Sequence, residues 1–243
     1  MFDPINKAEN VTQIITRDDL RKYYRFRAAR FYGGIATADC VGCCLQCIFC
    51  WSWREVINPN AYGHYYAPRD VARRLALIAR KKRFKNIRIS GNEPTLAREH
   101  LLKVLAMVPS DMLFILETNG ILIGHDRTYA EDLSRFDNLY VRVSIKGTNE
   151  EEFSGLTGAQ PQGFGLQLKA LENLRRAAVK THPAVMVSFS TPDNVDALRK
   201  QLIQIDNDYS DVEIEELTLY GDVEKRLEKT SVTYRTARKP QRK

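Results

Sequence analysis

The chain has 243 residues, of which 44% are hydrophobic and 28% are charged, as expected for one sizeable globular domain with a full core. Its first ten residues hold no apolar signal core, and no stretch approaches the roughly 20 apolar residues of a membrane span. We therefore expect a cytoplasmic protein with no membrane partner. The net charge of +7, with a pI near 9.1, directs attention to acidic partners.

Strand-like and helix-like segments alternate along the chain. Strands are predicted at 30–36, 86–90, 112–118, 138–146, 184–190 and 212–220. Helices are predicted between them at 68–82, 97–108, 127–136 and 164–180, and in a segment that contains Val195 and Ile205. This alternation predicts a parallel sheet with right-handed crossovers. The pattern alone fits either an open doubly wound sheet or a curved partial barrel.

Basic residues gather at 21–30 and at 234–243. The first segment could contact phosphates while its aromatic residues stack on bases, could hold an acidic protein, or could be a solvated helix face. The second has the composition of a disordered terminus. We therefore divide the chain into a basic N-terminal extension (1–29), a main domain (30–220) and a basic, flexible C-terminal tail (221–243).

All five cysteines fall between positions 40 and 50, and three of them, Cys43, Cys47 and Cys50, have the spacing C-x3-C-x2-C. Three thiolates on one loop can hold three corners of a cubane iron–sulfur cluster and leave one iron open. Two other arrangements use the same loop. Cys44 offers a C-x2-C-x2-C frame that resembles a ferredoxin run, and Cys40 and Cys43 could join Cys47 and Cys50 on zinc.

With Phe49 just before the last cysteine, the C-x3-C-x2-C loop resembles the signature of the radical S-adenosylmethionine (radical SAM) superfamily. The resemblance implies a [4Fe-4S] cluster on Cys43, Cys47 and Cys50, with SAM bound to the open iron. It also implies reductive cleavage of SAM to methionine and a 5′-deoxyadenosyl radical that abstracts hydrogen from a substrate. The implied fold is an α/β partial (β/α)6 barrel of parallel strands with helices outside. The implied electron donor is ferredoxin or flavodoxin.

The loop after the second strand, SGNEPTL, resembles the Gly-Gly-Glu motif that holds the SAM amino group in this family. Gly91, Asn92 and Glu93 occupy the motif, with Asn92 where the family usually has glycine. A carboxylate and open backbone carbonyls suit an ammonium group, and glycine permits close approach of the backbone.

The ends of the next three strands supply further candidates. The strings ETNG (117–120) and SIKG (144–147) resemble strings in the activating enzymes of glycyl-radical proteins. The resemblance places Ser144 and Lys146 beside the SAM ribose and carboxylate, and Thr118 deeper at the same mouth. Ser188, after the fifth strand, could meet the ribose or adenine, although helix capping competes for the residues that follow it.

The compact chain and its single cluster motif look most like those activating enzymes, so our first expectation for the substrate is a protein partner. No cysteine lies outside 40–50 to hold an auxiliary cluster. Radical SAM modification of RNA or of a small metabolite stays open. An alternative of another class is a non-catalytic iron–sulfur or zinc protein that binds nucleic acid.

Overall fold

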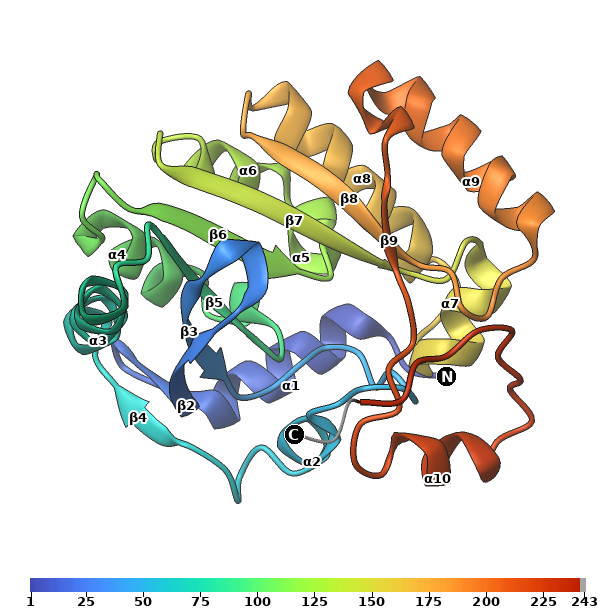
Figure 1. Ribbon diagram of the computed structural model, residues 1–243, viewed down its shortest axis with the longest axis horizontal. Helices are drawn as coiled ribbons and strands as arrows, with labels where there is room; N and C mark the ends of the chain where they lie inside the picture. The colour runs from blue at the N-terminus through green and yellow to red at the C-terminus, as the bar shows by residue number, and fades with distance from the viewer. Residues whose placement is uncertain (241–243) are drawn as a thin grey trace.

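The computed structural model describes residues 1–240 and is built around one curved, open sheet (Figure 1). Within these residues nine strands join in the order β1-β2-β3-β5-β6-β7-β8-β9, with β4 beside β2. The strands that run parallel to one another are β3 (Ile35–Cys40), β5 (Asn86–Gly91), β6 (Leu113–Thr118), β7 (Leu139–Lys146), β8 (Thr181–Met186) and β9 (Glu213–Glu215). The predicted parallel sheet and partial barrel are confirmed.

Helices follow the strands and cover the outer, convex side of the sheet (Figure 1). These are α3 (Pro68–Lys82), α4 (Arg98–Met107), α5 (Ile121–His125), α6 (Arg127–Leu133), α7 (Glu150–Thr157), α8 (Gly163–Arg176) and α9 (Pro192–Ile205). Three more helices lie nearer the ends of the chain and the cysteine loop: α1 (Pro4–Ile15), α2 (Trp53–Ile57) and α10 (Val223–Glu228). Between residues 1 and 240, no helix has both the length and the apolar character needed to cross a membrane.

The alternation of side chains along β7 explains how the sheet presents a polar wall to the barrel interior. Val141, Val143 and Ile145 are buried in the core, and the residues between them, Arg142 and Ser144, point to the opposite face. The interior of a closed barrel is usually filled by branched apolar side chains. Here the corresponding face carries charged groups, so it can border a cavity.

The segment predicted as a basic extension enters the sheet. Residues Leu20–Ala29 form β2, which pairs antiparallel with β3 and with β4 (His64–Tyr66), while β1 (Thr16–Arg17) pairs with β2. The interpretation of 21–30 as a helix face is therefore wrong.

The cations of β2 have partners inside the protein. Arg21 is buried, and so is Lys22, which donates to the carbonyls of residues 59 and 60. Arg25 and Arg27 both bind the buried carboxylate of Asp39, at 2.6 and 2.8 Å. Four of the five cations of 21–30 are thus engaged, and Arg30 is exposed without an ion pair to residues 1–240. The segment therefore offers less free basic surface than its sequence indicated.

The first parallel strand begins later than predicted. Positions 32–34 all have positive φ, namely Tyr32 (54°), Gly33 (75°) and Gly34 (126°). This turn separates β2 from β3, and a Cβ on Gly34 would lie only 2.4 Å from the ring of Phe84. The apolar start of the predicted strand therefore belongs to a turn, which glycine makes possible.

The C-terminal segment packs against the cysteine loop. Leu217, Val223 and Leu227 form a small apolar cluster, against which Ile48 and Phe49 pack. Helix α10 thus lies beside the loop instead of extending into solvent (Figure 1). Residues 241–243 of the predicted tail lie outside the described residues.

Candidate functional site

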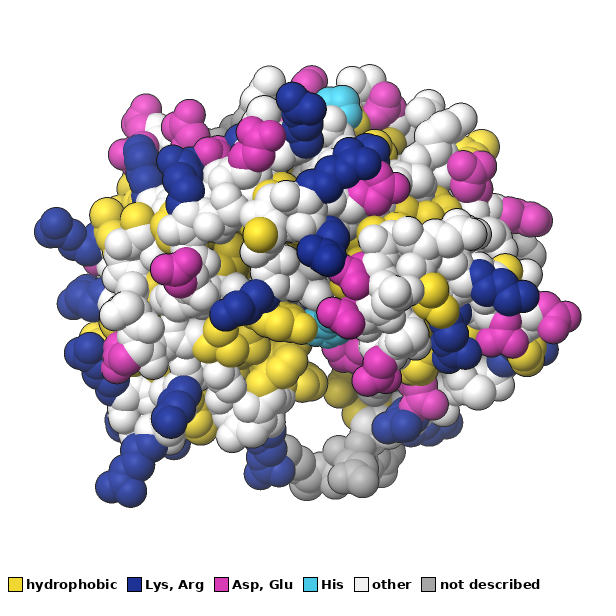
Figure 2. Space-filling model, turned by 90° about the horizontal axis from the view of Figure 1, so that it is seen from above, with side chains coloured by type: hydrophobic (Ala, Val, Ile, Leu, Met, Phe, Trp, Pro, Cys, Tyr) yellow, Lys and Arg dark blue, Asp and Glu magenta, His cyan; other side chains and the backbone are white. Residues whose placement is uncertain are grey.

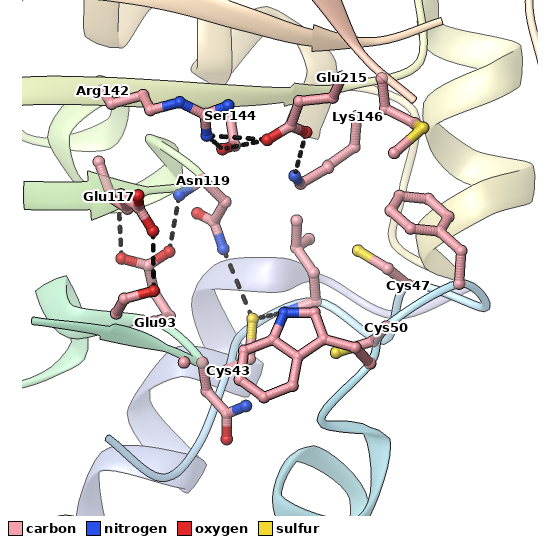
Figure 3. A pocket seen from close by; sticks show the side chains of 18 of the residues that line it. Cys43, Cys47, Cys50, Glu93, Glu117, Asn119, Arg142, Ser144, Lys146 and Glu215 are labelled. Carbon is pink, nitrogen blue, oxygen red and sulfur yellow. Dashed lines mark hydrogen bonds and ion pairs between the residues drawn. The ribbon is translucent and has the colours of Figure 1, made fainter. Parts of the chain in front are cut away.

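A cavity of about 400 Å³ lies where the cysteine loop meets the carboxyl ends of the parallel strands (Figure 3). It is the place where parallel α/β sheets and barrels bind ligands. The cavity lining contains nine residues predicted from the sequence: Cys43, Cys47, Cys50, Gly91, Asn92, Glu93, Thr118, Ser144 and Lys146.

The structure separates the five cysteines into two groups. Cys43, Cys47 and Cys50 line the cavity, whereas Cys40 and Cys44 are fully buried outside its lining. All five are free of disulfide bonds. The ferredoxin-like frame would need Cys44 in the cavity, and the zinc knuckles would need Cys40 there. The arrangement therefore favours the C-x3-C-x2-C frame.

The three cavity cysteines fit an iron–sulfur cluster. Their sulfurs face one space and keep no disulfide partner, and in residues 1–240 no three His, Cys, Asp or Glu side chains converge on a single metal ion. In a cluster each cysteine binds a different iron, so the sulfurs need not converge. Burial raises the pKa of the Cys47 and Cys50 thiols, so binding iron would have to displace their protons.

Asn119, which the sequence analysis did not single out, contacts the cysteine loop. Its side-chain Nδ2 lies 3.6 Å from Cys43 Sγ and 3.3 Å from Cys44 Sγ (Figure 3). Hydrogen bonds to ligand sulfurs tune the potential of a cluster. The sequence feature that could have identified Asn119 is its position directly after the third predicted strand, within the string ETNG (117–120).

The carboxylate of Glu93 is held by the protein itself. Oε1 accepts from the backbone and hydroxyl of Thr95, at 3.0 and 2.6 Å, and from the hydroxyl of Thr118 at 2.7 Å. Oε2 accepts from the backbone amide of Asn119 at 2.7 Å. Because its carboxylate already accepts from four donors, Glu93 fixes the shape of the loop around it. Thr118 contributes to this arrangement by donating to Glu93.

A buried cation supports the same loop from behind. The guanidinium of Arg21 donates to the carbonyl of Glu93 at 2.7 Å and to the carbonyl of Pro94. Gly91 takes a φ of 102°, and a Cβ there would lie 3.0 Å from the Cα of Asp39. The positive φ of this loop therefore falls on a glycine, which adopts it without strain.

Asn92 uses its side chain to join the cysteine loop to β5. Its Oδ1 accepts from the backbone amide of Gly42 at 2.8 Å, and its Nδ2 donates to Ser52 Oγ at 2.6 Å. Gly42 precedes the three cavity cysteines and Ser52 follows them. A glycine at position 92 could make neither contact, so the departure from the family motif has a structural role.

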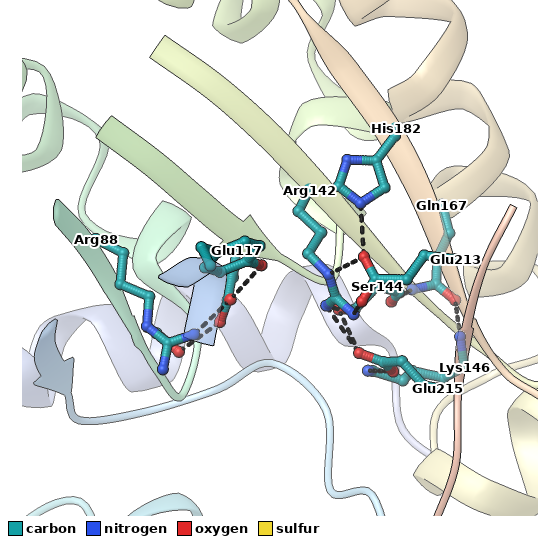
Figure 4. A network of polar contacts seen from close by, with 11 residues as sticks. Arg88, Glu117, Arg142, Ser144, Lys146, Gln167, His182, Glu213 and Glu215 are labelled. Carbon is teal, nitrogen blue, oxygen red and sulfur yellow. Dashed lines mark hydrogen bonds and ion pairs between the residues drawn. The ribbon is translucent and has the colours of Figure 1, made fainter. Parts of the chain in front are cut away.

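Charged residues of β7 and β9 form a network along the other wall of the cavity (Figure 4). Arg142 donates to both carboxylate oxygens of Glu213, at 2.9 and 2.7 Å, and lies 2.8 Å from Glu215. Lys146 Nζ lies 3.3 Å from Glu215 Oε2, and His182 Nε2 lies 2.7 Å from Glu213 Oε2. Alternating acids in VEIEE were the only sequence signal for Glu213 and Glu215.

Arg142, Lys146, Glu213 and Glu215 are ionised at neutral pH. Burial would lower the pKa of Lys146, but the charge of Glu215, its hydrogen bond with Lys146 and the nearby Cys47 together outweigh burial, and the pKa is raised. Burial would raise the pKa of Glu215, but Lys146 and Arg142 hold it below its usual value. Hydrogen bonds from His182 and Arg142 lower the pKa of Glu213 to about 2. Lys146 therefore carries its charge beside the cysteine loop.

Gln167 of α8 is fully buried and fixes two strand ends at once. Its Oε1 accepts from the backbone amide of Lys146 at 3.0 Å. Its Nε2 donates to the carbonyls of Asn119 and Ser144, at 2.6 and 3.0 Å. The spacing between β6 and β7 at the cavity thus depends on a residue that sequence reasoning treated only as part of a helix.

Two predicted serines have different surroundings. Ser144 lines the cavity and accepts from Arg142 at 2.8 Å. Ser188 lies outside the cavity lining, where its Oγ accepts from the backbone amide of Leu217 at 2.8 Å and contacts Thr236 Oγ1 at 3.2 Å. Ser188 thereby fixes the C-terminal segment.

Arg226 of α10 holds the cysteine loop from outside. Its guanidinium donates to the carbonyl of Ile48 at 3.1 Å and to the carbonyl of Cys50, and lies 5.0 Å from the ring centroid of Trp53. One carbonyl belongs to the last cavity cysteine and the other lies two residues before it. Arg226 lies in the segment predicted as a flexible tail (221–243), and nothing in the sequence indicated that it would contact the cysteine loop.

Comparison with known proteins agrees with this geometry. Residues 39–202 match the family model of the radical SAM superfamily, and no curated protein matches the sequence of this chain. Solved structures share the fold at low identity. They include SuiB of Streptococcus suis bound to S-adenosylmethionine (17% identity, TM-score 0.55, 73% of this chain and 38% of that one).

Two further structures have a similar likeness. One is anSMEcpe with bound AdoMet (21% identity, TM-score 0.56, 72% of this chain and 49% of that one). The other is TYW1 with a lysine-pyruvate adduct bound (15% identity, TM-score 0.51, 73% and 62%). This chain therefore spans less than two thirds of each of these neighbours. The family match covers more than half of the chain, which belongs to the radical SAM superfamily and shares its cofactors, a [4Fe-4S] cluster and SAM.

Proposed function

We propose that this radical SAM enzyme abstracts hydrogen from a peptide segment of a protein partner at the mouth of the cavity. The observation that carries the proposal is the shared cavity of three free cysteines and the strand-end residues Glu93 and Lys146. When bound, the cluster and SAM supply a 5′-deoxyadenosyl radical as the hydrogen acceptor. The residues of this chain bind and orient SAM and keep water from it.

The proposed SAM contacts follow from chemistry. The backbone of Gly91 and Asn92, fixed by the buried Glu93 carboxylate, offers acceptors to the SAM amino group. Lys146, charged and close to the cysteine loop, suits the SAM carboxylate. Ser144 is the hydroxyl available for the ribose.

Two observations support a peptide substrate. The neighbour SuiB has been solved bound to precursor peptide SuiA, and anSMEcpe with bound AdoMet and Cp18Cys peptide. In this chain, exposed aromatic side chains of Phe31, Trp51 and Tyr220 line the cavity and suit an apolar peptide side chain. A glycyl-radical partner is one form of this proposal. We propose ferredoxin or flavodoxin as the electron donor.

The test is to identify the source of the hydrogen. Reconstituted enzyme, SAM and dithionite would be incubated with protein, RNA and small-molecule fractions from the same fully deuterated cells. The 5′-deoxyadenosine formed would be analysed by mass spectrometry. We expect 5′-deoxyadenosine to contain deuterium when the protein fraction is present. Treating that fraction with protease beforehand should abolish the incorporation. Deuterium only from the RNA or small-molecule fraction would overturn the proposal.

A further inference from the structure

Helix α3 and the residues beside it form a strongly basic segment. Positions 67–86, which comprise α3 and its flanks, contain eight Lys or Arg residues and a single acid, Asp70. This excess of +7 equals that of the whole chain, so the other residues carry equal numbers of Lys/Arg and Asp/Glu. Figure 2 shows Lys and Arg side chains standing out along the edge that α3 occupies in Figure 1.

The exposed side of α3 is a regular stripe. Arg69, Arg73, Leu77, Arg80 and Lys81 recur at helical spacing and are all exposed, opposite the buried residues that face the sheet. We call these five residues the α3 face.

The cations of the α3 face are not neutralised. Across residues 1–240, only Arg73 of the four forms an ion pair, with Asp70 at 3.4 Å. On α8 and α9, by contrast, Lys169, Arg175 and Arg199 each have a carboxylate partner, and among the described residues Lys200 is the exposed cation of these helices without one. Other cations without an ion pair, such as Lys180 and Lys229, are scattered singly, whereas α3 gathers three of them on one face.

Helix stability accounts for only part of this charge. Cations near the C-terminus of a helix, such as Arg80 and Lys81, are favoured by the helix dipole. Arg69 lies in the first turn, where the dipole disfavours a cation, and it repels Arg73 four residues on. The placement of Arg69 is therefore not explained by helix stability, and a partner of opposite charge would account for it.

The centre of the α3 face is apolar. Leu77 is 57% exposed, and the four cations surround it at spacings of three, four and eight residues. An apolar centre with a charged rim is the anatomy of a protein interface. Single-stranded nucleic acids are instead held by cations together with aromatic stacking platforms, and the α3 face has no aromatic residue.

We propose that the α3 face is a docking surface for an acidic, amphipathic segment of a protein partner. The segment would place an apolar side chain on Leu77 and carboxylates on Arg69, Arg73 and Arg80. Identifying this partner with the substrate rests on the proposed function, while the docking itself does not. The surface would bind the partner at a distance from the cavity and raise the concentration of its reactive segment there.

The test uses the full chain reconstituted with its cluster, in 0.1 M salt. Anisotropy would report binding of a labelled helical peptide that alternates Glu and Leu at helical spacing, and of a labelled oligouridylate of equal charge. The variant Arg69→Glu, Arg73→Glu, Arg80→Glu should bind the peptide about tenfold more weakly, because three attractive contacts become repulsive. Leu77→Ser should weaken peptide binding severalfold and leave the oligouridylate unchanged.

The matched control reverses Lys180, Lys200 and Lys229, which are exposed and lie away from α3. It makes the same change in net charge and should alter peptide binding less than about twofold. Equal weakening by both triple variants would overturn the proposal, because only net charge would matter. Tighter binding of oligouridylate with no effect of Leu77→Ser would overturn it in favour of nucleic acid. All variants should cleave SAM like the wild type, because the α3 face lies away from the cavity. A wild-type chain that binds the peptide but cleaves no SAM would contradict the proposed function and leave the docking proposal intact.

Discussion

The side-chain oxygen of Asn92 accepts a hydrogen bond from the backbone amide of Gly42 at 2.8 Å, across 50 positions of sequence. With the second bond, from Asn92 to Ser52, it ties both ends of the cysteine loop to the residue that directly follows β5. The geometry of the cysteines thus depends on the loop that is proposed to bind SAM.

Replacing Asn92 with glycine would restore the usual family residue but remove both bonds. We expect Asn92→Gly to lose about 1–2 kcal/mol of stabilisation of the loop and to release cluster iron severalfold faster to a chelator. Asn92→Asp keeps an acceptor for both Gly42 and the Ser52 hydroxyl, so it should release iron nearly as slowly as the wild type. Iron release from Asn92→Gly at the wild-type rate would show that the cysteine loop keeps its geometry without the two Asn92 hydrogen bonds.

The two groups of cysteines should respond differently to substitution. Cys47→Ala removes a cavity sulfur and should abolish cluster-dependent SAM cleavage. Cys44→Ala removes a buried sulfur outside the cavity and should keep the cluster, with a cost to folding stability of about 1 kcal/mol. Iron and sulfide content, measured per chain, checks both. Loss of the cluster from Cys44→Ala would mean that the other cysteine frame is used.

Removing the Glu93 carboxylate should impair SAM binding more than cluster binding. Glu93→Ala leaves the hydroxyl of Thr95 and the amide of Asn119 without their acceptor, at a cost of about 1–3 kcal/mol. We expect SAM affinity to fall about tenfold or more, with iron content unchanged; equilibrium dialysis with labelled SAM measures the first. Unchanged affinity would remove the loop from the proposed SAM site.

Arg226 should stabilise the cysteine loop from α10. Arg226→Ala removes two charge-assisted bonds to loop carbonyls, worth about 1.5–3 kcal/mol each when charged. Hydrogen exchange of residues 45–52 should become faster, and iron release to a chelator should increase. Lys225→Ala, the exposed neighbouring position, is the control and should change neither. Equal effects of the two variants would contradict this role.

Folding stability should depend on pH through His100. Burial lowers the pKa of His100 to about 4. Its Nδ1 lies 2.8 Å from the carbonyl of Asp19, so Nδ1 donates and Nε2 accepts from the hydroxyl of Tyr23 at 3.1 Å. The unfolded chain therefore takes up a proton near pH 6.5, before the folded chain does.

Stability should then fall as the pH drops from about 6.5 towards 4, by up to about 3 kcal/mol for a difference of 2–3 pKa units. His100→Gln removes this group and should lower stability at pH 7 but flatten its pH dependence. Urea midpoints at pH 7 and pH 5 measure both effects. The same midpoint shift in wild type and variant would exclude His100 as the cause.

Much of the fold could be predicted because it depends on local periodicity. The four middle parallel strands and the longer helices were placed to within about four residues, since apolar alternation and helical spacing are local signals. The first parallel strand begins five residues later than predicted and the last ends five residues earlier, and the short helices α5 and α7 were not predicted. Strand β2 was missed because its alternating basic residues looked like a solvated face, whereas Arg25 and Arg27 share the buried carboxylate of Asp39 on the next strand. Such long-range pairing leaves no local pattern.

The cavity residues likewise divide into those with a local sequence signal and those placed by long-range contacts. Cys43, Glu93 and Lys146 lie at strand ends within recognisable strings, so the sequence could place them near the cavity. Gln167 and Arg226 act through backbone carbonyls of distant elements, and no sequence spacing indicates such contacts. Tertiary packing alone brings these residues to the site.

The central claim is that three cysteines of this chain support radical cleavage of SAM. The most direct test is anaerobic reconstitution with iron and sulfide, followed by SAM and dithionite, with 5′-deoxyadenosine measured by mass spectrometry. We predict formation of 5′-deoxyadenosine by the wild type and by Cys44→Ala, and none by single alanine variants of Cys43, Cys47 or Cys50. No 5′-deoxyadenosine from wild-type chains with a loaded cluster and bound SAM, or its formation by a variant that lacks one of the three cysteines, would contradict the account.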